Sequence, residues 1–273
     1  MCGGGNRLLR DTEHKHEQNA AELRLIPFFQ PKIDMRDGGL AGAEALVRGV
    51  DKDGNIIMPA QFISEMEKDG SIGKLDFFML ENVLKQLSEW KAKGLPQIKM
   101  SVNMSRITLF APKTLDTVLE IRSRYPDIPV KLVEFEITET AGDVGKSALA
   151  HIVDSFRERG FSFELDDFGA GYANISLFSN IKFKAIKLDR SLVDDLPDNA
   201  ISSMFVENIT KICRNFGMEC IAEGVETRQQ AESLLQAGCV YGQGFYYSKP
   251  ISALEFEARY LNGPGISVKP DMV

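Results

Sequence analysis

Short apolar runs that end in a carboxylate, an amide or a lysine recur along the chain, and this recurrence constrains the fold more than any other feature. They end at Glu44, Asn103, Glu136, the pair Asp166–Asp167, Lys187 and Glu223. Residues this far apart in sequence gather only if parallel strands deliver their carboxyl ends to one place. Because clustered acids repel one another unless divalent cations neutralise them, the pattern predicts a metal site at the mouth of a barrel.

Strand and helix signals alternate from about residue 20 onward. The expected strands cover 26–34, 39–48, 98–104, 130–138, 161–166, 185–188, 219–222 and 240–246. The expected helices cover 59–68, 74–93, 107–124, 144–159, 174–180, 200–215, 228–236 and 253–261. Four residues, 35–38, join the first two strands, and a parallel crossover needs about a dozen, so these strands should pair antiparallel.

Eight strands, seven of them in a strand–helix rhythm, predict an α/β protein with a TIM-like (β/α)8 barrel and an antiparallel first strand. The length of 273 residues also allows two smaller sheet domains, although no linker-like break divides the chain. Residues 1–19 are polar and Gly-rich, and we expect a flexible leader or a linker stub there. The folded domain is expected over 20–273.

Composition excludes several functional classes. The net charge of −7 without a basic block argues against a nucleic-acid polymer as partner. The apolar runs are too short for a membrane span and no signal-peptide pattern follows the start, so we expect a cytoplasmic protein. Four cysteines without Cys-x-x-Cys spacing, and three histidines away from strand ends, give poor support to a zinc site, a disulfide or a histidine-based triad.

Each strand end has an ordinary structural explanation when taken alone. Glu44 fits a solvated strand end, Asn103 and Glu136 lie in stretches that could cap helices, and Lys187 could be a surface lysine. The adjacent Asp166 and Asp167 are a stronger signal, because an Asx turn needs only one aspartate. Neighbouring side chains on a strand point to opposite sides, so one could bridge two metals while the other binds metal or orients water. All the strand ends together are difficult to explain without a site.

Two further acids do not fit this scheme. Strand alternation places Glu134 on the same face as Glu136, and Glu164 on the same face as Asp166. Either bulges reverse the alternation, or buried bases pair with these acids.

These residues, in this order, resemble the EAL domain family of cyclic di-GMP phosphodiesterases. The resemblance covers about residues 24–262 and rests on motifs that are specific in identity and spacing. The motifs are Phe29–Pro31, Glu44–Leu46, Asn103, Glu136–Glu139, Asp166–Gly169, Lys187–Arg190, Glu223–Glu226, Gln243–Gly244 and Ser248–Pro250. Gly49 replaces a frequent aromatic and Ala170 a frequent threonine, but neither is a ligand position.

The resemblance implies hydrolysis of cyclic di-GMP to linear pGpG with two Mg²⁺ or Mn²⁺ ions per site, and inhibition by Ca²⁺. The implied ligands of one ion are Glu44, Asn103, Glu136 and Asp166, and those of the other are Asp166, Asp167 and Glu223. The resemblance gives catalytic roles to Asp167, Lys187, Gln243 and Glu139. Lys187 would hold or polarise the attacking water, and Gln243 would support that water. Glu139 would anchor the loop after the fifth strand. Ligand contacts are implied for Gln30, Arg48 and Glu226.

The resemblance further implies a homodimer and leaves room for an upstream sensory domain. A non-catalytic cyclic di-GMP receptor is the main alternative, and the complete set of acids argues against it. An enolase-like barrel that uses Lys187 as a base is a second alternative.

Overall fold

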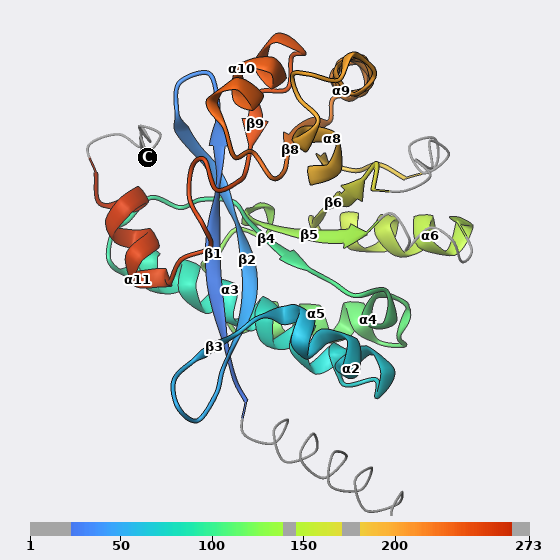
Figure 1. The fold of residues 1–273 in the computed structure, drawn as a ribbon. Helices are drawn as coiled ribbons and strands as arrows, with labels where there is room; N and C mark the ends of the chain where they lie inside the picture. The colour runs from blue at the N-terminus through green and yellow to red at the C-terminus, as the bar shows by residue number, and fades with distance from the viewer. Residues whose placement is uncertain (1–22, 139–145, 171–180, 264–273) are drawn as a thin grey trace, which may run out of the picture.

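The computed structural model describes residues 23–138, 146–170 and 181–263, and its centre is a closed eight-stranded barrel. The barrel strands are β1 (Arg24–Asp34), β2 (Gly39–Val50), β4 (Met100–Asn103), β5 (Val133–Thr138), β6 (Ser162–Phe168), β7 (Ala185–Leu188), β8 (Glu219–Ala222) and β9 (Tyr241–Gly242). β1 pairs antiparallel with both β2 and β9, and every other pairing between barrel strands is parallel (Figure 1). The predicted barrel with an antiparallel first strand is therefore confirmed.

The hairpin between β1 and β2 sets the position of the first site residues. Gly38 has a φ of 76°, and the Asp37 side chain accepts a hydrogen bond from the Gly39 backbone at 2.8 Å, as expected for a tight Asp-Gly turn. The register pairs Gln30 with Glu44. One side of the hairpin therefore places an amide opposite the first carboxylate of the apolar-run pattern.

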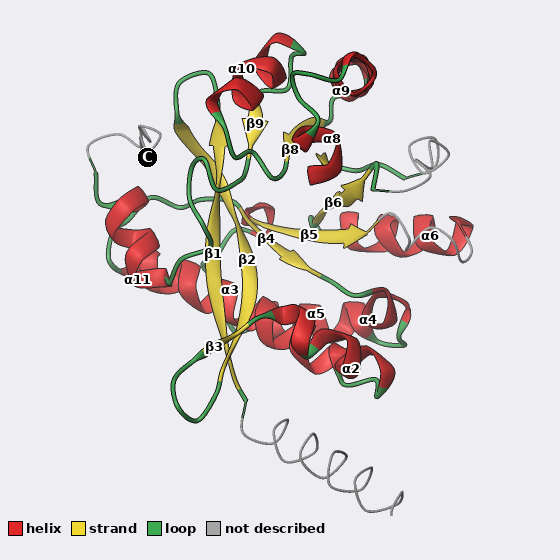
Figure 2. Cartoon of the chain, viewed as in Figure 1, coloured by secondary structure: helices red, strands yellow, loops and turns green. Residues whose placement is uncertain are grey.

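Helices lie outside the barrel, as Figure 2 shows. They are α2 (Ile63–Lys68), α3 (Ile72–Ala92), α4 (Arg106–Phe110), α5 (Thr114–Ser123), α6 (Lys146–Arg157), α8 (Arg190–Asp194), α9 (Ala200–Asn215), α10 (Arg228–Gln236) and α11 (Ala253–Phe256). Short 3-10 segments occupy Pro59–Gln61 and Val130–Leu132, and a π-helical turn occupies Glu257–Leu261. A short strand, β3 (Ile56–Ile57), pairs antiparallel with the end of β2.

Some boundaries differ from those predicted. The helix expected over 107–124 is two helices, because Pro112 lies between α4 and α5 and cannot continue a helix. The last barrel strand ends at Gly242, since the following backbone turns to hydrogen-bond Val225. The short α8 was not predicted. The leader at 1–19 and the helix at 174–180 lie outside the described residues.

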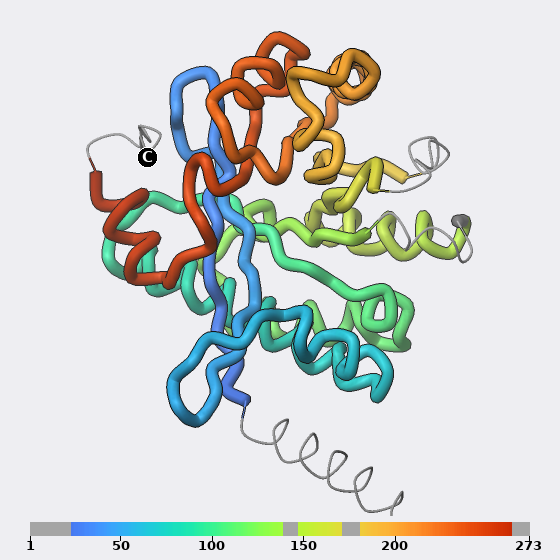
Figure 3. The backbone as a smooth tube through the Cα atoms, in the orientation of Figure 1, coloured from blue at the N-terminus to red at the C-terminus, as the bar shows by residue number. Residues whose placement is uncertain are grey.

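Apolar strand residues point outward to the helices, which leaves the barrel interior to the alternate positions. On β5, Phe135 contacts Phe156 of α6 with ring centroids 5.6 Å apart, whereas the neighbouring Glu134 and Glu136 face inward. Figure 3 shows the last described segment running beside β1, where Phe29 and Ile251 exchange backbone hydrogen bonds. Because apolar packing holds the strands from outside, charged side chains can occupy the interior of the barrel.

Candidate active site

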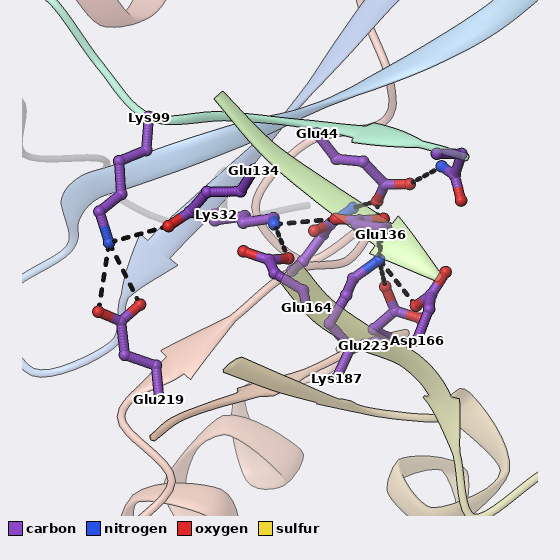
Figure 4. A network of polar contacts seen from close by, with 12 residues as sticks. Lys32, Glu44, Lys99, Glu134, Glu136, Glu164, Asp166, Lys187, Glu219 and Glu223 are labelled. Atoms are coloured by element: carbon purple, nitrogen blue, oxygen red, sulfur yellow. Dashed lines mark hydrogen bonds and ion pairs between the residues drawn. The ribbon is translucent and has the colours of Figure 1, made fainter. Parts of the chain in front are cut away.

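Lys187 lies at the centre of a group of carboxylates at the carboxyl end of the parallel strands (Figure 4). Its Nζ is 2.7 Å from Glu136 Oε2, 2.7 Å from Glu223 Oε1, 2.9 Å from Asp166 Oδ1 and 3.3 Å from Glu44 Oε2. The Lys187 side chain is 1% exposed. Residues of β2, β5, β6 and β7 and the residue after β8 thus converge, as the apolar-run pattern predicted. Glu44, however, lies in the middle of β2, which continues to Val50, and not at a strand end.

Asp167 joins this group through an irregular backbone. The pairing of β6 with β7 shifts register between Leu165 and Phe168, and Asp167 has a φ of 55°, which is rare for a residue with a side chain. One oxygen each of Asp166, Asp167 and Glu223 lie within 4.8 Å of one another. The expectation that the two aspartates point to opposite sides is therefore wrong, because the bulge turns both toward the same place.

Amide side chains complete the polar surface of the site. Asn103 donates its Nδ2 to Glu44 Oε1 at 3.0 Å, which leaves its Oδ1 available as a ligand. Gln243 Nε2 donates to Glu44 Oε2 at 2.7 Å and to Gln30 Oε1 at 2.9 Å. Among the described residues, Gln243 Oε1 is buried without a hydrogen-bond partner. A buried acceptor of this kind is suited to a water or a cation.

The charge balance of the site fits a pair of divalent cations. In the part of the chain that the structure describes, five carboxylates, those of Glu44, Glu136, Asp166, Asp167 and Glu223, surround the one ammonium group of Lys187, while the Glu164 carboxylate beneath them pairs with Lys32. Full ionisation leaves four negative charges, which two divalent ions would neutralise. Carboxylate and amide oxygens are also the hard ligands that Mg²⁺ and Mn²⁺ prefer.

Burial opposes ionisation of most of these acids. It is the main cause that raises the pKa of Glu44 to about 7 and the pKa of Glu223 to about 8, and neighbouring acids add to the effect. Burial likewise raises the pKa of Asp166 and of Asp167. These groups therefore gain most from a bound cation, which favours their charged forms.

Lys187 and Glu136 stay charged. Burial opposes the charge of each, but contact with Asp166, Glu136 and other acids raises the pKa of Lys187 well above its usual value. Against burial, Lys187 and Lys32 hold the pKa of Glu136 well below its usual value. With the acids around it unbound by cations, Lys187 is a hydrogen-bond donor rather than a proton acceptor, which gives no support to the enolase-like alternative.

Two cavities meet at the carboxylate group. One, of about 280 Å³, is lined by residues that include Gln30, Arg190, Glu226 and Phe245. The other, of about 640 Å³, has a largely apolar wall formed by residues such as Leu46, Pro59, Leu75, Asp76, Met79 and Met104. Both are lined by Glu44, Leu46 and Asp166. The space beside the acids therefore has two lobes, one more polar than the other.

The remaining predicted residues lie at different distances from this centre. Arg48 is buried, donates to the Val47 carbonyl at 2.7 Å and lies over the Phe28 ring; it is absent from the linings of the two cavities. Glu226 is exposed and pairs with Arg190 at 2.9 Å. Gln30 donates to the Ser248 carbonyl at 3.0 Å. Glu139 lies outside the described residues.

Two lysines, one buried and one half-exposed, pair with the two acids that did not fit the strand scheme. Glu164 pairs with Lys32 at 2.5 Å, and Glu134 is 3.6 Å from Lys99 (Figure 4). The second explanation, a buried base, is therefore correct for Glu164, whereas the base beside Glu134 is half-exposed. Sequence analysis did not single out Lys32, although a lysine two residues after Gln30 on one strand face was an available signal.

Comparison with known proteins agrees with the geometry. A model of the EAL domain family matches residues 15–250. The chain is 30% identical over 244 residues to the probable cyclic di-GMP phosphodiesterase PdeG of Escherichia coli K12, and 31% over 237 residues to the cyclic di-GMP phosphodiesterase PdeR of the same strain. The alignments cover 89% and 87% of this chain but only 48% of PdeG and 35% of PdeR.

A solved structure shares the fold over nearly its whole length. The structure described as the PaMucR phosphodiesterase in complex with c-di-GMP has a TM-score of 0.80 at 27% identity, and the match covers 92% of this chain and 99% of that one.

None of the described helices in the present chain combines the length and the hydropathy that a membrane span requires.

Proposed function

The chain belongs to the EAL domain family, and from that premise we propose that it hydrolyses cyclic di-GMP to linear pGpG with two Mg²⁺ or Mn²⁺ ions. The observation that carries the proposal is the convergence of five carboxylates on Lys187 at the mouth of the barrel. The names of PdeG and PdeR describe cyclic di-GMP phosphodiesterases, and the PaMucR complex contains that ligand, which supports the choice of substrate.

The residues that would hold the ions come from separate barrel strands and the residue after β8. We assign Glu44, Asn103, Glu136 and Asp166 to one ion, and Asp166, Asp167 and Glu223 to the other. When bound, two divalent cations neutralise charge on a phosphodiester and make water acidic enough to lose a proton near neutral pH. The clustering of Asp166, Asp167 and Glu223 oxygens within 4.8 Å supports this assignment.

Lys187 acts as a donor in this scheme. Its ammonium holds the attacking water or stabilises negative charge that develops on the phosphate oxygens, and the surrounding acids favour its charged form. Gln243 is tied to Glu44 through its Nε2, so its free Oε1 can accept a hydrogen bond from the same water. The role of Asp167 is to bind an ion and orient water.

The two cavities suit a ligand with two bases and a central phosphodiester. One lobe has apolar walls from Leu46, Pro59 and Met104, and its Asp76 carboxylate can accept hydrogen bonds from the N–H groups of a purine. Gln30 and Glu226 line the other lobe. Since the lobes meet at Glu44 and Asp166, a phosphodiester between the two bases would lie at the acids.

We propose two further substrate and loop roles. Arg48 lies two residues after Leu46 on the face that carries Glu44, and a change of its side-chain rotamer would allow it to contact a phosphate. Glu139 follows β5 directly, so it is placed in sequence to anchor the loop after β6.

A turnover assay tests the function. The purified chain is incubated with cyclic di-GMP and Mg²⁺, Mn²⁺, Ca²⁺ or EDTA, and products are identified by liquid chromatography and mass spectrometry. We expect pGpG with Mg²⁺ or Mn²⁺ and none with Ca²⁺ or EDTA. Tight binding of cyclic di-GMP with Mn²⁺ but no pGpG would instead support the receptor alternative.

We also propose that the chain acts as a homodimer, in which a sensory domain upstream could regulate the site. The exposed Ile201 and Met204 at the start of α9 offer apolar surface for such an association. Sedimentation velocity measures the oligomeric state, and a fully active monomer would contradict the proposal.

A further inference from the structure

Lys32 lies directly beneath the candidate metal site, on the side away from the barrel mouth. Its Nζ is 3.0 Å from Glu136 Oε1 and 2.5 Å from Glu164 Oε2, while Glu136 uses its other oxygen to contact Lys187 at 2.7 Å (Figure 4). The Lys32 side chain is 7% exposed, and those of Glu136 and Glu164 are 0% and 1% exposed. Both oxygens of Glu136 are therefore fixed by ammonium groups.

Stability alone does not account for this buried charge. Removing a lysine and two carboxylates from water costs free energy, and well-packed apolar side chains at such positions are often as stabilising or more so. Barrel interiors are usually filled by apolar side chains. A buried lysine that contacts a candidate metal ligand fits another role, because partners of metal ligands commonly fix the orientation of those ligands.

Glu164 matches the charge of Lys32 without belonging to the site. It contacts Lys32 but is not among the acids in contact with Lys187. Burial raises the pKa of Glu164, whereas the contact with Lys32 at 2.5 Å favours its ionised form; when both groups are charged, the pair adds no net charge beneath the carboxylates. Lys32 fixes one oxygen of Glu136 by direct contact and, together with Lys187, keeps that carboxyl ionised.

We propose that Lys32 is a positioning residue that fixes the Glu136 carboxylate for divalent metal binding, and that Glu164 is its counter-charge. This inference rests on the proposed function, because it requires Glu136 to be a metal ligand. Lys32 touches neither water nor substrate in this role. Its loss should weaken metal binding far more than it slows turnover once metal saturates the site.

The test uses the purified full chain and Mn²⁺ as the probe. The double variant Lys32→Met/Glu164→Val removes both buried charges, keeps similar volumes and leaves the net charge unchanged. The control is Lys99→Met, which disrupts the ion pairs with Glu134 and Glu219 lower in the barrel without touching a site carboxylate. Isothermal titration calorimetry measures Mn²⁺ affinity, thermal unfolding in EDTA measures stability, and turnover is measured at saturating Mn²⁺.

We expect the double variant to bind Mn²⁺ about 10–100-fold more weakly than wild type, with kcat at saturating Mn²⁺ within a few-fold. Lys99→Met should keep wild-type Mn²⁺ affinity. Wild-type affinity in the double variant, or an equal loss in Lys99→Met, overturns the inference. Wild-type chain that binds Mn²⁺ but forms no pGpG overturns the proposed function alone, and wild-type chain that binds no Mn²⁺ overturns both.

Discussion

Replacement of Lys187 by methionine gives the sharpest test of the candidate site, because one ammonium there contacts four carboxylates, of which three are buried. The contacts range from 2.7 to 3.3 Å, to Glu136, Glu223, Asp166 and Glu44. Methionine is one atom shorter than lysine, so it keeps most of the apolar stem and removes the charge. The variant therefore separates the electrostatic contribution of Lys187 from its contribution to packing.

The expected loss of stability follows from this burial. Removing one partner of a buried ion pair costs roughly 3–5 kcal/mol. For a domain of this size 1 kcal/mol corresponds to about 2–4 °C in Tm, so the metal-free variant should unfold roughly 6–20 °C below wild type at pH 8. At pH 6 the difference should shrink, because Glu44 and Glu223, whose pKa values are about 7 and 8, then carry protons. Saturating Mn²⁺ should restore most of the loss.

Turnover should fall even where stability is restored. Loss of one preorganised donor to developing charge costs about 10²–10³ in rate, and we expect kcat for pGpG formation to fall by this factor at saturating Mn²⁺. Lys184→Met is the matched control, since Lys184 forms one half-exposed pair with Glu219 at 2.8 Å, worth about 1 kcal/mol or less. An unchanged kcat in Lys187→Met would refute its role at the reacting water, and an unchanged Tm in EDTA at pH 8 would refute the electrostatic argument.

Four other predictions follow from the same geometry. Asp166→Asn should abolish pGpG formation and weaken Mn²⁺ binding while the circular dichroism spectrum stays native; normal turnover would exclude a bridging role. Tm of the metal-free chain should fall as pH rises from about 5 to 8.5. The pKa values of Glu44 and Glu223 are raised in the folded state, so the folded state binds protons more tightly than the unfolded state, and this stabilisation is lost through pH 7 to 8. A Tm that rises over this range would contradict the prediction. Ca²⁺ should support binding of cyclic di-GMP, measured by calorimetry, without product, and equal rates with Ca²⁺ and Mn²⁺ would contradict the requirement for a smaller ion. Arg48→Ala should weaken cyclic di-GMP binding by about 10-fold or more, as expected for a hydrogen bond to a charged group, and an unchanged Kd would remove Arg48 from the phosphate contacts.

Most helices and strands could be located from the sequence because turn or capping residues mark both of their ends. The ranges of β7, β8, α9 and α10 agree with those predicted, and Asn199 and Thr227 cap the two helices with their side chains. The sequence was less informative where one pattern covers two elements. Pro112 interrupts a continuous helical periodicity, and the last strand ends early because its backbone pairs with Val225.

The convergence of the acids could be predicted because it depends mainly on which strand end each residue occupies. The placement of Asp167 could not, since it depends on a register shift and a positive φ that the sequence does not specify. Nor could the partners of Glu134 and Glu164 be named, because contacts across the barrel depend on stagger between strands. The lysines that pair with these acids are distant in sequence: Lys32 is 132 residues from Glu164, and Lys99 is 35 residues from Glu134.

The distribution of charge along the barrel explains why ions should bind at only one end. At the closed end, Glu134 and Glu219 are matched by Lys99 and Lys184, and in the middle Glu164 is matched by Lys32. Among the described barrel residues, acids exceed bases at the mouth alone, where five carboxylates surround Lys187. Because buried charges that balance locally attract no further ion, the unmatched negative charge, and hence the drive to bind cations, is confined to the end where the two cavities open.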